Sequence, residues 1–221
     1  MINFIKKVKE HTISLNKILL GVISIATVII AIFQSQIAIE QLNASKLAYS
    51  PLFIFNITQI ENPSTGNYDD EKLEISNVGF PINNFESTSL VYFKASKIAS
   101  NNGMAKTVII PMVYYGISFS NTGGNGVLAT HVGKENNKDI VNLIWGVNDL
   151  NKQQTLMFYT AEIIRANKIT YTDIENIDHV VYFINQRSVP KEIYDEKTKT
   201  NINKTYNHGD INTSLITLLL N

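Results

Sequence analysis

The chain has no cysteine among its 221 residues. This absence excludes a disulfide framework, a zinc site built on thiolates and a cysteine nucleophile. Arginine is scarce too, because only Arg165 and Arg187 occur among nineteen basic residues. Basic and acidic residues balance at a formal net charge of zero. We therefore predict no binding to nucleic acid, since phosphate recognition needs a surplus of positive charge and favours the bidentate guanidinium.

One stretch near the N-terminus lacks charge altogether. Between Lys17 and Glu40, twenty-two consecutive residues carry no ionisable side chain. As a helix this run spans about 33 Å, against about 30 Å for the hydrocarbon core of a bilayer. We predict a transmembrane helix over residues 18–39. A buried core helix is disfavoured because the run has no polar stripe, and a cleaved signal peptide because no pair of small residues follows at cleavage spacing.

Lysines are distributed unevenly around this span. Four lysines precede it, whereas only Lys46 lies within about fifteen residues after it. The positive-inside rule then places residues 1–17 in the cytoplasm as a basic segment. The expected topology is a signal-anchor, single-pass protein of the cell membrane with its C-terminal domain outside the cytoplasm.

A helical stalk is expected to continue the span. From Gln36 to Ala48 the residues are good helix formers with apolar side chains mostly three to four apart. Pro51 ends the helix, because the residue before a proline is pushed out of helical geometry. We assign residues 40–50 to this juxtamembrane stalk and 51–221 to a separate domain. The apolar stripe either docks onto that domain or supports a homo-oligomer through the transmembrane helix and stalk.

After Pro51 the pattern changes to short β-type runs separated by clusters of asparagine and glycine. The first ends in a turn around Pro63, and the second is expected to end at Val78–Pro81. About ten such runs predict a mainly β domain, an antiparallel β-sandwich. The candidate strands are residues 52–60, 72–77, 89–95, 107–113, 114–120, 127–132, 155–164, 168–171, 179–185 and 214–220.

Two segments do not follow the strand pattern. The apolar residues of Asp139 to Leu150 fit a helix face, and a subset also fits a strand face. We predict one short inserted helix there, capped by Asn136 or Asn137. Residues 193–209 are polar and rich in lysine. This composition predicts an exposed hairpin or mobile loop.

Two local patterns carry a resemblance. The segment Leu73 to Gly79 resembles a turn found early in immunoglobulin-like bacterial domains, and Ile169 to Asp173 followed by His179 to Phe183 resembles their late hairpin. With the stalk and proline before them, these stretches are similar to uncharacterised bacterial single-pass membrane proteins with an immunoglobulin-like β-sandwich. The resemblance implies an interaction domain and names no ligand. Low arginine with abundant asparagine, isoleucine and lysine suggests an AT-rich genome of a bacterium or its phage.

Few side chains form a chemically suggestive pattern. His208 and Asp210 lie on one side of a polar turn and are candidates for metal binding or acid–base chemistry, with a plain turn as the alternative. The acidic group Asp69, Asp70 and Glu71 could hold calcium, although a solvated hairpin turn is the simpler interpretation. The glycines 123, 124 and 126 indicate a hairpin loop, because no Lys-Ser or Lys-Thr follows them to complete a phosphate-binding loop.

These observations favour a membrane-anchored, non-enzymatic binding module. We predict no catalytic residue, no metal site and no cofactor. The expected partners are the lipid bilayer and another protein or a glycan. One alternative is an oligomerising membrane effector of a defence or toxicity system, suggested by the polar residues Gln34, Ser35 and Gln36 at the end of the span. A less favoured alternative is an enzyme acting on cell-wall material through Asp210 or Asp173.

Overall fold

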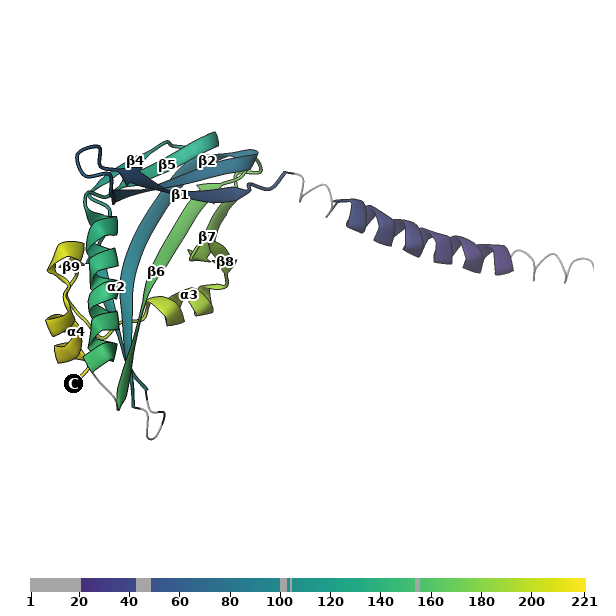
Figure 1. Cartoon of the computed structure of the whole chain (residues 1–221). Coiled ribbons are helices and arrows are strands. Elements are labelled where there is room, and N and C mark those ends of the chain that lie inside the picture. Colours follow the sequence, from purple (N-terminus) through teal and green to yellow (C-terminus); the bar gives the residue numbers. More distant parts are fainter. Residues whose placement is uncertain (1–20, 43–48, 100–102, 104, 154–155) are drawn as a thin grey trace, which may run out of the picture. The chain divides into compact units, whose positions relative to one another are not determined.

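The computed structural model describes residues 21–42, 49–99, 103, 105–153 and 156–221. The chain divides into two compact units between Ser50 and Pro51 (Figure 1). Each unit is described by itself below.

Within its described residues, the first unit contains one helix, Gly21–Leu42, that is long and apolar enough to cross a membrane. All of its side chains are exposed, as a lipid-facing helix requires. The Thr27 hydroxyl donates to the Ile23 carbonyl oxygen at 2.8 Å, which hides this polar group on the helix itself. The helix runs past the predicted end of the span at residue 39 into the predicted stalk. Residues 18–20 and 43–48 lie outside the described part of the chain.

The second unit is mainly β, as predicted, and its strands pair almost entirely antiparallel. In chain order the elements are β1 (Phe53–Glu61), β2 (Tyr68–Ala99), β3 (Ala105–Val113), β4 (Ile117–Ser120), β5 (Gly124–Val132), α2 (Asn136–Gln153), β6 (Met157–Thr172), β7 (Asp178–Ile184), β8 (Arg187–Val189), α3 (Lys191–Thr198), β9 (Tyr206–Asn207), η1 (His208–Asp210) and α4 (Thr213–Leu219).

The long strand β2 organises the sheet, whose main order is β4-β5-β2-β6-β7-β8. The first half of β2 pairs with β1 and β5, and its second half pairs with β3 and β6. The two halves curve so that residues of both pack into one core, where the Phe55 and Phe183 rings lie 4.7 Å apart. β2 is therefore shared by two halves of the sheet. We call the stretch Asn77 to Glu86, which contains one register shift against β5 and another against β6, the bend of β2.

Helices cover both faces of the second half of the sheet (Figure 1). On one face, Phe93 of β2 packs with Val147 of α2 and Ile216 of α4. On the other face, Tyr92 packs with Tyr194 of α3. Neighbouring residues of a strand point to opposite faces, so a strand covered on both sides has no polar alternation. This is why the run Leu90–Phe93 has no polar residue.

The predicted helix is present as α2, and its helix-face pattern was the right interpretation. Ile140, Leu143 and Val147 are buried at spacings of three and four residues, whereas Trp145 is 65% exposed. Asn136 is fully buried at the start of this helix, and its side-chain oxygen accepts the Asn137 N–H at 3.0 Å. The helix ties β5 to β6 and covers the sheet.

Two C-terminal predictions were wrong. The run at residues 214–220, expected as a strand, forms the helix α4. Asn212 caps this helix by accepting the Leu215 N–H at 3.0 Å. The helix places Ile216 and Leu220 one turn apart, and both are buried. Residues 193–209, expected as an exposed hairpin or loop, include most of α3. The ring of Tyr194 buried against Tyr92 fixes that helix.

The predicted breaks inside two strands were also wrong. Residues 78–81, expected to close a strand, belong to β2 as a local shift in register between Asn77 and Ile82. The buried Asn77 side chain bridges this irregularity, because it accepts the Leu52 and Gly79 N–H groups and donates to the Phe80 and Gly124 carbonyls. Residues 155–164 and 168–171 were expected as two strands, but residues 157–172 form the single strand β6. Residue 155 lies outside the described part of the chain.

Candidate functional site

A buried ion pair lies beside the bend of β2. The Glu71 carboxylate receives two hydrogen bonds from Arg165, at 3.2 Å from Nε and 2.6 Å from Nη2. The Glu71 side chain is only 2% exposed. The pair joins strands β2 and β6 through side chains 94 positions apart. The sequence did not indicate this pair, because the run of Asp69, Asp70 and Glu71 is typical of a solvated acidic turn.

Two tyrosines complete the coordination of Glu71. The Tyr114 hydroxyl donates to one carboxylate oxygen at 3.2 Å, and the Tyr115 hydroxyl donates to the other at 2.8 Å. Burial, together with the negative charge of Glu71, raises the pKa of both phenols above its usual value. Burial by itself would lower the pKa of Arg165, but the Glu71 carboxylate outweighs this effect and raises it. The charges of Glu71 and Arg165 thus cancel locally. The hydrogen bonds of Tyr114 and Tyr115 to Glu71 fix the segment that connects β3 to β4.

A chain of hydrogen bonds runs through His131 next to Tyr115. The Ser89 hydroxyl donates to Asn167 Oδ1 at 2.7 Å, so Ser89 Oγ is an acceptor for His131 Nε2 at 3.0 Å. His131 Nδ1 is then unprotonated and accepts the Ser118 hydroxyl at 2.7 Å. Burial lowers the pKa of His131, which favours this neutral form. His131 is a hydrogen-bonded core imidazole, the commoner role for a histidine in a strand.

A cleft opens above this chain, between the end of β3, the middle of β2 and β4. It encloses about 380 Å³, near the lower end of the range of about 300 to 1,000 Å³ that is common for small-molecule sites. Most of its polar lining consists of hydroxyl groups, and its apolar lining is aliphatic on one side. The lining residues are Ser87, Thr88, Ser89, Leu90, Val91, Met112, Val113, Tyr114, Tyr115, Ser118, His131 and Thr205.

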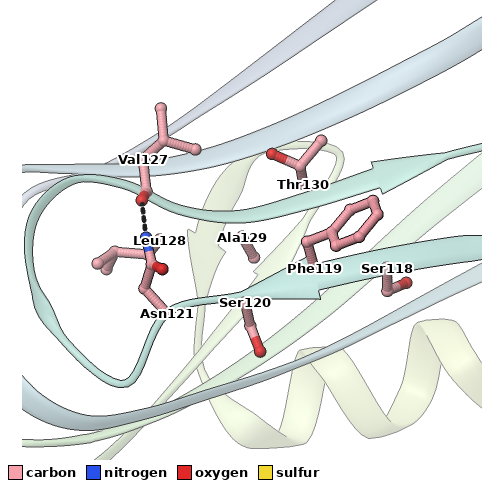
Figure 2. A pocket seen from close by; sticks show the side chains of 8 residues that line it. All are labelled: Ser118, Phe119, Ser120, Asn121, Val127, Leu128, Ala129 and Thr130. Atoms are coloured by element: carbon pink, nitrogen blue, oxygen red, sulfur yellow. Dashed lines mark hydrogen bonds between the residues drawn. The ribbon is translucent and has the colours of Figure 1, made fainter.

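A second hollow of about 470 Å³ lies against the β4–β5 hairpin (Figure 2). It is lined by residues 118–121 and 127–130, and Ser118 belongs to both hollows. The hairpin itself was predicted correctly from its glycines. Gly123 has a φ of +155°, and a Cβ there would lie 2.3 Å from the Ile82 carbonyl oxygen, so the loop crosses β2 at a distance only glycine permits.

The structure separates the acidic residues that were candidates for calcium binding. Asp69 accepts the Asn62 side-chain amide at 2.8 Å, and Asp70 accepts the Glu135 backbone N–H at 2.7 Å. Glu71 faces Arg165 instead. The three residues lie in β2 and not in a solvated turn. The sequence did carry a sign of this arrangement. Asp69 and Glu71 are two residues apart, so in a strand both side chains point to the same face.

His208 and Asp210, the candidates for metal binding or acid–base chemistry, contact different partners. His208 Nδ1 lies 2.7 Å from Asp139 of α2, whereas Asp210 accepts the Asn207 amide at 3.3 Å. His179 Nε2 lies 2.6 Å from Asp173, and its ring stacks on Tyr171. Within the described residues, no group of three or more acidic or histidine side chains could hold a metal ion. His11 lies outside those residues.

No protein-family model matches the chain, and no curated protein matches it significantly. The cleft is lined by neutral side chains, many of them with hydroxyl groups, and two of its tyrosines are held by the neutralised Glu71–Arg165 pair.

Proposed function

We propose that this chain is a single-pass membrane protein of a bacterium or a phage. Its β domain is a non-enzymatic binding module that lies outside the cytoplasm. The observation that carries the proposal is the cleft at the bend of β2, in a chain that also has a membrane-length apolar helix. The excess of lysines before the helix supports the orientation. Tethering would raise the effective concentration of the cleft near ligands held at the cell surface.

The hydrogen bonds of His131 support binding over nucleophilic catalysis. A serine nucleophile needs a base whose second ring nitrogen is held by a group that stabilises the imidazolium, usually a carboxylate. Ser118 does contact His131 Nδ1, but Nε2 is bonded to the neutral hydroxyl of Ser89. The nearby carboxylate, Glu71, is already neutralised by Arg165. Protonation of His131 would thus lack a compensating charge.

Protease protection on intact cells tests the orientation. External protease should remove the β domain of the full-length chain and leave only a membrane-embedded fragment. Degradation only after lysis would refute the extracytoplasmic placement.

A binding experiment tests the module itself. The full chain in lipid nanodiscs would be mixed with solubilised cell-envelope fractions, alongside a Val113→Trp variant that fills the cleft. Val113 is 47% exposed at the rim, so the larger ring can be accommodated there. Retention of an envelope component by the wild-type chain and its loss in the variant is the expected result. Equal retention of every component by both chains would refute binding at this cleft.

A further inference from the structure

The cleft at the bend of β2 has a distinct donor and acceptor pattern. The proton of Ser118 is committed to His131 Nδ1, and that of Ser89 is committed to Asn167. Ser118 Oγ therefore presents lone pairs and no proton to the cleft. A ligand group that meets it must be a donor, such as a hydroxyl or an N–H.

Three further hydroxyl groups are available to a ligand. Ser87, Thr88 and Thr205 line the cleft, and their hydroxyls bond to no other protein group in the described part of the chain. Each can donate one hydrogen bond and accept others. Thr88 and Thr205 are exposed and Ser87 is half-buried, so all three can be reached from solvent. The cleft thus offers several neutral hydrogen-bonding groups within a small volume.

Charge and apolar surface narrow the ligand class. No lysine, arginine or carboxylate lines the cleft, and the Glu71–Arg165 pair, which holds the lining residues Tyr114 and Tyr115, is neutralised within itself. Burial lowers the pKa of His131 and keeps it neutral. Leu90 and Val113 add exposed aliphatic surface at the rim. A charged ligand would lose hydration without gaining an opposite charge.

From this pattern we infer that the cleft binds a neutral carbohydrate of one or two sugar rings. Neighbouring residues of β2 point to opposite faces, but β3 pairs with β2 only from Val91 onward, so a ring lying along the open β2 edge at residues 87–90 can reach side chains on both faces. Sugar hydroxyl groups there would donate to Ser118 Oγ and exchange hydrogen bonds with Ser87, Thr88 and Thr205. The C–H face of a ring would pack on Leu90 and Val113, and a volume of about 380 Å³ admits a ligand of this size. This inference rests on the proposed binding function and names its ligand class.

The test is a titration of the full chain in nanodiscs with glucose, galactose, N-acetylglucosamine and maltose. Binding is measured by isothermal calorimetry and by ligand-observed NMR. Glucuronic acid and inorganic phosphate are the charged comparisons. At least one neutral sugar should bind, and Ser118→Ala should weaken it about three- to tenfold, the effect of one neutral hydrogen bond. Val113→Trp should abolish it.

The matched control is Ser120→Ala, which changes a serine of the same strand that lines only the hollow shown in Figure 2. This variant should bind as the wild type does. Ser118→Ala also removes a hydrogen bond to the buried His131, so binding is compared at a temperature at which circular dichroism shows every variant to be folded. The assignment is overturned if no neutral sugar binds, if Ser118→Ala and Val113→Trp leave binding unchanged, or if glucuronic acid or phosphate binds more tightly.

The two failures can be told apart. If envelope components are retained through the cleft but no sugar binds, the ligand class is wrong and the binding function stands. A peptide of alternating valine and threonine that binds where the sugars do not would likewise overturn the carbohydrate assignment, because β4 is an edge strand and can accept an extended chain. If neither envelope components nor sugars depend on the cleft, both proposals fail.

Discussion

The ion pair between Glu71 and Arg165 should contribute more to stability than any exposed pair of this domain that the structure describes. Replacing Glu71 by glutamine keeps the shape and one acceptor oxygen but removes the negative charge. Arg165, whose side chain is only 19% exposed, then loses its counter-charge. Breaking a buried ion pair from one side typically costs about 3 to 5 kcal/mol.

The hydrogen bonds place Glu71→Gln near the lower end of that range. Four donors converge on the carboxylate, two from Arg165 and one each from Tyr114 and Tyr115. A glutamine oxygen can still accept from some of them, whereas its NH₂ group must face a donor. We expect a loss of about 3 kcal/mol in the free energy of unfolding.

Urea unfolding of the full chain in detergent micelles measures this loss. Far-ultraviolet circular dichroism and the fluorescence of Trp145, the single tryptophan, report on the β domain. The matched control is Glu162→Gln, which removes the exposed ion pair with Lys94. Its cost should stay below about 1 kcal/mol, because solvent screens exposed pairs.

A double-mutant cycle separates the ion pair from simple packing. Arg165→Met alone leaves the Glu71 charge buried, whereas Glu71→Gln combined with Arg165→Met removes both charges. The combined loss should be smaller than the sum of the two single losses by at least about 1.5 kcal/mol. Additive losses, or a cost for Glu71→Gln no greater than for Glu162→Gln, would refute the reasoning.

Three further predictions follow from single positions. Gly133→Ala should lower the free energy of unfolding in urea by more than about 2 kcal/mol, because its Cβ would lie 2.0 Å from Asn136 Nδ2. The control Gly116→Ala has open space around the new Cβ and should change the free energy of unfolding by less than about 0.5 kcal/mol. Burial lowers the pKa of His131 in the folded state, so its contribution to stability is present above about pH 6.5 and is lost as the pH falls to the folded pKa. Stability measured between pH 7 and 5 should therefore fall more steeply for the wild type than for His131→Gln. Parallel curves for the two chains would contradict this prediction. Val28→Arg places a charge in the apolar helix at a cost of about 2.5 to 3.5 kcal/mol, so membrane fractionation should show less of the chain retained, and unchanged retention would argue against a span.

Features set by local pattern were predictable from the sequence. The apolar helix follows from an uncharged run long enough to cross a bilayer. The mainly β character follows from short runs divided by turn residues, and α2 follows from Ile140, Leu143 and Val147 at helical spacing. In each case the signal lies within one segment, where the backbone period and the side-chain pattern agree.

Features that depend on distant partners were decided only by the tertiary structure. The run of α4 is too short for its period to distinguish helix from strand, and packing of Ile216 and Leu220 against α2 and the sheet settled it. Pairing with β5 at Asn77 and again at Ile82 carried β2 past the residues between them that resemble a turn. The ion pair of Glu71 with Arg165 and the hydrogen bonds of His131 join residues far apart in the chain. Such contacts form only after the sheet has curved, because burial then makes partners obligatory for groups that water would otherwise satisfy.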